Sequence, residues 1–212
     1  MEDILEEPET IQENSLFLTI WTRSTETFNY IFKHCPTKYV NGIITGYGIA
    51  NAIILNLLFF ISHISLSISL IIIMAPLIWL LTWLGVYIQS VLMSWSGKWI
   101  GGRADLDQFV TVSAWSFVPA IASIFPIAIQ AIVFDNTYSY FQTNEQNVYL
   151  IVLYYLILAA RTGLTLWSFV IFIKGTAVLQ QFSFRKSILN VILALSIIIV
   201  PIIIIGGLIY LL

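Results

Sequence analysis

The chain has 212 residues, of which 59% are hydrophobic and only 9% are charged. An ordinary soluble domain carries about 25% charged residues, and the apolar residues here gather in runs long enough to cross about 30 Å of hydrocarbon. This composition excludes a water-soluble globular monomer. The single cysteine and the two histidines also exclude an internal disulfide, a cysteine-cluster metal site and a multi-histidine metal site.

The first 38 residues are polar enough to lie outside the membrane. Six acidic residues fall within residues 1–14, which we expect to be a disordered cytoplasmic tail. Residues 15–38 then carry apolar side chains at helical spacing, which predicts a short interfacial amphipathic helix with a break near Ser24. This segment could lie in the headgroup layer, with Trp21 and Phe28 as anchors, or it could pack under the cytoplasmic face of the bundle.

Five continuous apolar runs follow, at residues 39–62, 66–95, 109–134, 148–174 and 188–212. Each run is long enough to be a transmembrane helix, and none alternates between apolar and polar residues as the strands of a β-barrel do. The sequence therefore predicts an all-α integral membrane protein whose five-transmembrane-helix bundle occupies residues 39–212.

The basic residues predict the orientation of this bundle. Eight of them lie on one side of the predicted spans, namely Arg23, Lys33, Lys38, Lys98, Arg103, Lys174, Arg185 and Lys186, and the opposite loops have none. By the positive-inside rule the N-terminus is cytoplasmic and the C-terminus external. Trp95 and Trp99 fall at the cytoplasmic boundary, where indole rings favour the headgroup layer, so we expect them to be interfacial anchors.

Arg161 is the one charged residue in the interior of a predicted span. It lies 13 residues from either end of residues 148–174, about 20 Å from each end and near the midplane. No span contains an acidic residue to neutralise it. Asn51 is expected at the same depth, with Asn56 and Gln130 farther outward. These four residues form a hypothetical binding site for an anion or a lipid phosphate, and the alternative is a structural arginine held by Asn51.

Small residues mark where helices could approach closely in lipid. Gly42, Gly46 and Ala50 form a stripe on the first span, and Ala159 and Gly163 lie four residues apart on the fourth. The first stripe could be the contact between two copies of the chain, or it could pack inside one bundle.

Motifs for catalysis are missing from the sequence. It has no zinc-protease motif, no intramembrane pair of carboxylates and no nucleophile elbow, and Gly101-Gly102-Arg103 is a turn rather than a phosphate-binding loop because it lacks the Gly-Lys-Ser/Thr ending. We therefore expect no enzymatic activity, no catalytic residue, no metal and no cofactor. A net charge of −2 with scattered basic residues also argues against nucleic acid as a partner.

Three separate stretches share a further pattern. They are Ile20-Trp21-Thr22-Arg23-Ser24-Thr25-Glu26-Thr27-Phe28, then Gly101-Gly102-Arg103 leading to Ser116-Phe117-Val118-Pro119, and finally Gly175 through Leu179-Gln180-Gln181-Phe182-Ser183 to Ser187-Ile188-Leu189-Asn190-Val191. In order and spacing, over about residues 18 to 210, they resemble the bacterial branch of the Yip-domain (Ypt/Rab-interacting-protein) family. Ser24 stands where that family usually has proline.

The resemblance implies a five-helix membrane protein with a cytosolic N-terminus, linked in eukaryotic relatives to vesicle traffic and membrane shaping. The Asp-Leu-Tyr-Gly-Pro-type motif through which those relatives bind Rab-type GTPases is not found in this sequence. We expect a non-enzymatic protein of the bacterial inner membrane that packs its helices against membrane partners, copies of itself or lipids. The alternative is a small oligomeric transporter or lipid-handling protein with a polar site around Arg161.

Overall fold

The computed structural model describes residues 11–61, 67–134 and 148–211, and their secondary structure is helical. The elements are η1 (Glu13–Ser15), α1 (Leu16–Thr22), α2 (Ser24–His34), α3 (Val40–Ile61), α4 (Ile68–Trp99), α5 (Leu106–Ser116), α6 (Val118–Ala122), α7 (Ile124–Val133), α9 (Val148–Gln180) and α10 (Phe184–Leu211). Five segments are long and apolar enough to cross a membrane: Val40–Phe59, Ser69–Trp99, Leu106–Val133, Val148–Gln180 and Phe184–Gly207. The predicted all-α, five-span architecture is confirmed.

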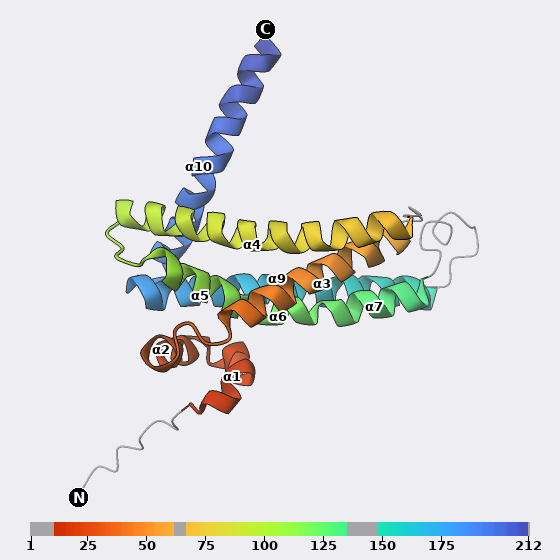
Figure 1. Cartoon of the computed structure of the whole chain (residues 1–212), viewed down its shortest axis with the longest axis horizontal. Helices are drawn as coiled ribbons and strands as arrows, with labels where there is room; N and C mark the ends of the chain where they lie inside the picture. Colours follow the sequence, from red (N-terminus) through yellow and green to blue (C-terminus); the bar gives the residue numbers. More distant parts are fainter. Residues whose placement is uncertain (1–10, 62–66, 135–147, 212) are drawn as a thin grey trace, which may run out of the picture.

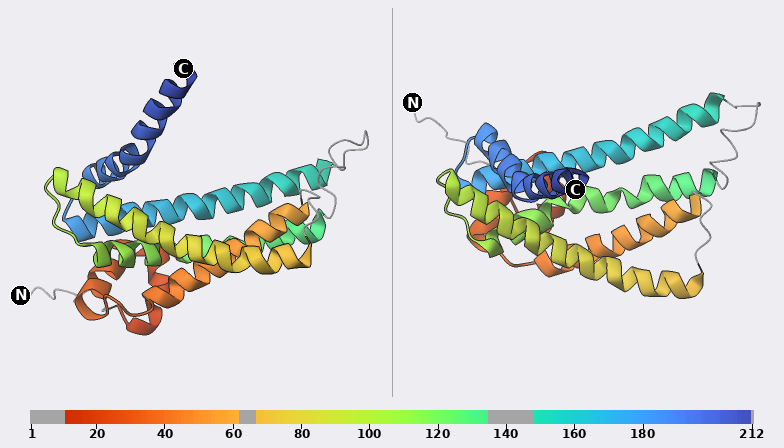
Figure 2. Two further views of the ribbon diagram at one scale, coloured as in Figure 1. Left: turned by 45° about the horizontal axis from the view of Figure 1, so that its top comes forward. Right: turned by 90° about the horizontal axis from the view of Figure 1, so that it is seen from above.

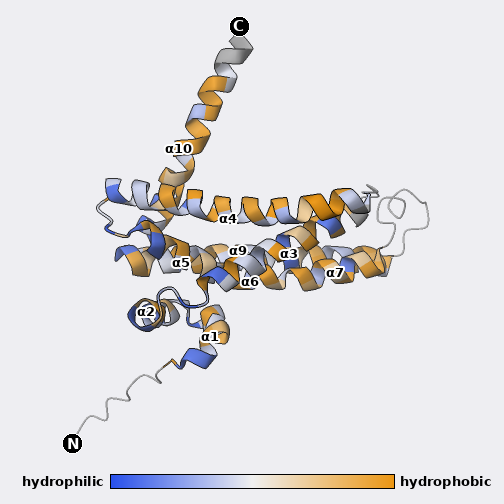
Figure 3. Cartoon of the chain, in the orientation of Figure 1, coloured by the Kyte–Doolittle hydropathy of each residue, from blue (hydrophilic) through white to orange (hydrophobic). Residues whose placement is uncertain are grey.

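Four of the five spans lie side by side. The long axis of the molecule is followed by α3, by α4, by the series of short helices α5 to α7, and by α9 (Figures 1 and 2). The fifth span, α10, starts between the ends of α4 and α9 and then points away from the bundle. Apolar residues cover these helices, and polar residues gather around α2 and the turns at the same end (Figure 3). The predicted basic, cytoplasmic ends of the helices are therefore on one side of the molecule.

The third span is broken into three helices, although the sequence predicts one. The breaks fall at Phe117 and Ser123, whose backbone N–H groups bond to the carbonyl three residues back rather than four. Pro119 and Pro126 follow each break within the first turn of the next helix, where a missing N–H costs least. The hydroxyls of Ser116 and Ser123 donate to carbonyls three residues back, at 2.7 and 2.6 Å. Proline and serine together therefore segment this helix.

Helices α4 and α9 both run past the ends predicted for them. We placed the end of the fourth span at Lys174, but α9 continues to Gln180, because a helix does not stop where the hydrocarbon does. Gly175 lies inside α9 and gives room for the ring of Phe28, whose carbon atoms would be 2.7 Å from a Cβ there. The predicted loop of residues 175–187 thereby shrinks to three residues, Gln181 to Ser183, before α10.

The N-terminal helices pack against the bundle rather than lying free in the headgroup layer. Leu16, Ile20, Phe28 and Ile31 have no exposed surface and belong to the same core as α5 and α9. The predicted break is present at Arg23, but Ser24 does not cap α2: its hydroxyl donates to the carbonyl of Ile20 at 2.8 Å. Of the two alternatives for this segment, the structure supports packing under the bundle.

Order extends back into the stretch predicted to be a disordered tail. Glu13 begins η1, and its carboxylate accepts a hydrogen bond from the Tyr39 hydroxyl at 2.9 Å and pairs with Lys38. Tyr39 in turn packs edge-on to Phe17 and to the buried ring of Trp115 in α5. Residues 1–10 of the predicted tail lie outside the described residues.

Candidate functional site

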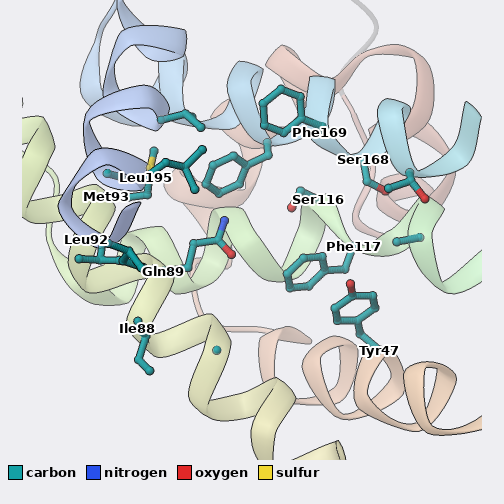
Figure 4. A pocket seen from close by; sticks show the side chains of 17 residues that line it. Tyr47, Ile88, Gln89, Leu92, Met93, Ser116, Phe117, Ser168, Phe169 and Leu195 are labelled. Carbon is teal, nitrogen blue, oxygen red and sulfur yellow. The ribbon is translucent and has the colours of Figure 1, made fainter. Parts of the chain in front are cut away.

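A pocket of about 470 Å³ lies where α10 leaves the bundle. Its walls come from α3, α4, α5, α6, α9 and α10, and they are mostly apolar (Figure 4). A few polar side chains, those of Tyr47, Gln89, Ser116, Thr165 and Ser168, are set among the apolar ones. Ligand sites in proteins have this character, because apolar walls supply affinity and a few polar groups fix orientation.

Gln89 is the principal polar group of the pocket. It projects from the middle of α4 toward Ser116 and Phe117 of the opposite wall (Figure 4). Across the pocket, the hydroxyl of Ser168 on α9 is buried and has no hydrogen-bond partner among the described residues. The Ser116 hydroxyl is already used, since it donates to the carbonyl of Ser113. An amide and a free hydroxyl in apolar surroundings can hold a polar group from another helix or a lipid.

The pocket lining contains no aspartate, glutamate, histidine, lysine or arginine. Its chemistry is therefore that of hydrogen bonding and apolar contact. Among the described residues, no group of three His, Cys, Asp or Glu side chains lies close enough to hold a metal ion.

Arg161 lies one turn beyond the edge of the pocket, and its partner is not the predicted one. Its guanidinium Nη1 donates to Oε1 of Gln130 on α7 at 3.3 Å, and Gln130 is itself buried. In the observed α9, Arg161 is 13 residues from Val148 and 19 from Gln180. The structure thus brings together two of the four predicted binding residues, Arg161 and Gln130.

The other two predicted binding residues lie apart from this pair. The Nδ2 atom of Asn51 is 3.5 Å from the hydroxyl of Thr82, a long contact between α3 and α4. Asn56 donates to the carbonyl of Ala52 in its own helix at 2.8 Å. Their depth was counted along straight helices, and depth alone does not say which face of α3 a residue occupies.

Two of the three small residues of α3 pack inside the bundle, whereas those of α9 do not. Ala50 is buried, and a Cβ at Gly46 would be 3.9 Å from Ile121 of α6, so this stripe serves packing within one chain. Gly42 is exposed and has open space around it. Ala159 and Gly163 also face outward, with nothing within 4 Å of a Cβ at Gly163. Among the described residues they do not pack against another helix of this chain, so their role in helix packing stays a prediction for contacts with another molecule.

The predicted anchors also divide into two groups. Trp95 and Trp99 are 53% and 54% exposed near the end of α4, where they are free to meet headgroups. Phe28 has no exposed surface and so is a core residue rather than an anchor. Trp21 is half-buried, and its carbonyl accepts the indole N–H of Trp167 at 3.0 Å.

Sequence reasoning missed a polar cluster at the end of the bundle that carries the predicted cytoplasmic turns. Oε1 of Gln180 accepts the backbone N–H groups of Arg103 and Ala104 at 2.8 and 3.1 Å. Close by, the hydroxyl of Ser96 donates to Oδ1 of Asn190 at 2.7 Å. Gly97 permits this meeting of α4, α9 and α10, since a Cβ there would be 2.3 Å from Nε2 of Gln180.

This cluster joins two of the stretches on which the family resemblance rests. Gly102 and Arg103 come from the turn after α4, Gln180 from the end of α9 and Asn190 from α10. Gln89 was also missed, although a lone glutamine in the middle of an apolar run is a visible signal.

Comparison with known proteins identifies the family. The family model for the Yip1 domain matches residues 18–205, nearly the whole chain. Neither the curated proteins nor the solved structures contain a match. Because the match spans all five apolar segments and the packed N-terminal helices, the chain belongs to the Yip1-domain family of membrane proteins.

Proposed function

We propose that the chain is a non-enzymatic membrane protein that acts by lateral packing against other membrane helices, in membrane organisation or a trafficking-like role. One observation carries the proposal: the pocket at Gln89 lies beside the base of α10, and among the described residues no other helix packs against the outer half of α10 (Figure 1). Ile202, Ile203, Ile204 and Ile205 are 56% to 66% exposed, and four consecutive residues surround a helix.

Packing in lipid gives a physical reason for such an arrangement. Lipid tails are as apolar as isoleucine, so the hydrophobic effect does not drive an exposed apolar helix to associate with another helix in the membrane. Association instead requires shape complementarity and polar contacts. The pocket offers both, because Gln89 and Ser168 lie among apolar residues at its wall.

The partner we propose is the outer half of α10 from a second copy. A helix that leaves its own bundle is free to reach the pocket of a neighbour, and exchange of identical elements is a low-cost route to dimers. We place the protein in a bacterial inner membrane because its three motif stretches resemble the bacterial branch of the family. We orient it with the N-terminus in the cytoplasm and the C-terminus external because the basic residues gather at one end of the bundle.

Cysteine cross-linking between two tagged copies tests this proposal. In a Cys35→Ser background, one copy carries Ile88→Cys at the pocket and the other Ile202→Cys on α10. Oxidation in native membranes should give a dimer that carries both tags. The matched control replaces Ile88→Cys with Ile72→Cys, which is exposed on α4 but does not line the pocket. No doubly tagged dimer, or an equal yield with the control, would contradict the proposal.

The alternative function, a transporter or lipid-handling protein with a site at Arg161, has less support. Arg161 and Gln130 are paired with each other, while Asn51 and Asn56 bond elsewhere on α3 and α4. A transport site needs polar groups that converge on a substrate, and these four do not converge.

A further inference from the structure

A second pocket, of about 480 Å³, lies at the predicted cytoplasmic end of the bundle, far along α4 and α9 from the centre of the membrane. Its walls are the turn after α4, the start of α5, the turn after α9 and the first turn of α10. The lining residues include Gly101, Arg103, Gln108, Gln180, Gln181 and Lys186. The polar character of this pocket sets it apart from the apolar pocket at Gln89.

Two turns of the same type form its walls. Gly101, with φ of +84°, follows α4, and the N–H groups of Gly102 and Gly101 bond back to the carbonyls of Gly97 and Lys98. Gln181, with φ of +55°, follows α9, and the N–H groups of Phe182 and Gln181 donate to the carbonyls of Ala177 and Val178. Both are Schellman motifs, which close a helix and satisfy its last carbonyls.

Gln180 holds the two turns together. Its amide is enclosed between Gly97 and Gly102, because a Cβ at Gly102 would be only 2.1 Å from its Oε1 atom. Oε1 accepts the N–H groups of Arg103 and Ala104, so the backbone of the first turn is fixed by the second. The Nε2 atom of Gln180 is buried and has no acceptor among the described residues. The turn carrying Arg103 is therefore preorganised.

The pocket carries two positive charges and no negative one. Arg103 and Lys186 both line it, no aspartate or glutamate does, and neither cation is in an ion pair with a described carboxylate. The Nζ atom of Lys186 lies 4.3 Å from the centre of the Phe182 ring and reaches over the Gly101 turn. The carboxylates nearest in sequence, Asp105 and Asp107, lie outside the lining.

The backbone N–H groups of the turn are already bonded, so an anion here must be held by side chains. An arginine fork beside a lysine is the combination that recognises a phosphate group. Trp95 and Trp99, exposed at the same end of α4, place the pocket at headgroup depth, and the Leu179 and Phe182 side chains give it an apolar edge.

We propose that this pocket binds the phosphate of an anionic phospholipid in the cytoplasmic leaflet, with Arg103 and Lys186 as its ligands. The inference rests on the membrane location of the chain but not on the pocket at Gln89 or on dimer formation. Failure of the cross-linking experiment above therefore leaves it standing.

Lipid retention by the full chain in a neutral detergent tests the proposal, with native mass spectrometry as the readout. The probes are phosphatidylglycerol, phosphatidylcholine and inorganic phosphate. The wild type should retain phosphatidylglycerol over phosphatidylcholine, and Arg103→Gln/Lys186→Gln should lower the affinity for phosphatidylglycerol about tenfold. The control Lys33→Gln/Arg185→Gln removes the same two charges outside the pocket and should change it less than about twofold.

Three outcomes would overturn the proposal. The first is equal retention of the two lipids by the wild type, and the second is an equal loss in the two double variants, which would mean general surface attraction. The third is complete displacement of phosphatidylglycerol by inorganic phosphate, which would assign the site to a free phosphate. Because the replaced side chains are exposed, both variants should fold, and circular dichroism with size-exclusion chromatography verifies this. Gly102→Ala, which alters the turn without changing charge, should also lower phosphatidylglycerol retention.

Discussion

Gln180 and Arg103 are 77 residues apart in sequence, yet the side-chain oxygen of one accepts the backbone N–H of the other at 2.8 Å. This bond ties the end of α9 to the turn between α4 and α5, so three of the five spans meet at one amide. It is possible only because Gly97 and Gly102 leave the amide enough room. The stability of the cytoplasmic end should therefore depend on these glycines.

Gly102→Ala should destabilise the fold. A Cβ there would lie 2.1 Å from Gln180 Oε1, and overpacking of this kind costs about 1–3 kcal/mol of unfolding free energy. Thermal unfolding in detergent measures the change. The control Gly163→Ala has open space around it in α9 and should instead stabilise by about 0.5–1 kcal/mol. A neutral Gly102→Ala would show that the Gln180 amide can move aside.

Gln181→Gly should stabilise the protein. Gln181 has φ of +55°, where a side chain costs about 1–2 kcal/mol and glycine costs nothing. The greater freedom of glycine in the unfolded chain takes back part of this gain, so we expect a net gain of about 0.5–1 kcal/mol. The control Thr162→Gly, exposed within α9, should destabilise in the same unfolding measurement. A loss at both positions would mean that the Gln181 side chain has contacts that outweigh the strain.

The attachment of the N-terminal segment should depend on pH. Hydrogen bonds from Lys38 and Tyr39 lower the pKa of Glu13 below its ordinary value of 4.5. Because the pKa of Glu13 is lower in the folded protein than in the unfolded chain, the contact stabilises the folded state fully at pH values above 4.5. This stabilisation is lost as the pH falls through the pKa of Glu13 in the folded protein. The protection of the amides of residues 11–15 against hydrogen exchange, measured relative to the intrinsic rate at each pH, should therefore fall in acid. Glu13→Gln should show the low protection already at neutral pH, and Ser15→Ala, which leaves the carboxylate intact, should keep the pH dependence. Protection that does not change with pH would mean that the carboxylate does not hold this segment.

The spans were predictable because hydrophobic length alone defines a transmembrane helix. The glycines and prolines that shape the turns and breaks, namely Gly97, Gly101, Gly102, Pro119 and Pro126, are also visible in the sequence. Partners were not predictable. Arg161 was assigned to Asn51 by counting residues from helix ends, but equal depth does not say which faces of two helices meet. Gln130 lies on α7, beyond the breaks of the third span at Phe117 and Ser123. The side of α7 on which Gln130 lies depends on those breaks, and the pattern of apolar residues in the sequence does not predict it.

The departure of α10 was equally hidden. Its composition is that of an ordinary span, with a mean hydropathy of 3.1 over its apolar window, and hydropathy carries no information about tilt. Tilt is decided by contacts with neighbours, and in the described part of the chain α10 packs against α4 and α9 near its base (Figure 1). The same limit explains why the pocket at Gln89 was not predicted: it exists because one helix is not where a compact bundle would put it.

The Arg161–Gln130 hydrogen bond should show strong coupling between its two residues. Arg161→Leu leaves the buried amide of Gln130 without its donor, and Gln130→Leu leaves the guanidinium without its acceptor, so each single change should cost about 1–3 kcal/mol of unfolding free energy. The double variant replaces both groups by apolar side chains and should cost less than the sum, as replacements of buried polar pairs often do. Chemical unfolding in bicelles measures all three variants.

The matched cycle pairs Arg161→Leu with Asn51→Leu, whose Nδ2 atom contacts Thr82 instead, and these two changes should add to within about 0.5 kcal/mol. Additivity in the Arg161–Gln130 cycle would mean that the 3.3 Å contact contributes nothing to stability. Coupling in the Asn51 cycle would instead favour our original pairing of Asn51 with Arg161. A nonadditive term confined to Gln130 assigns Arg161 a structural role between α7 and α9, because a guanidinium already committed to a buried amide has fewer donors left for a ligand.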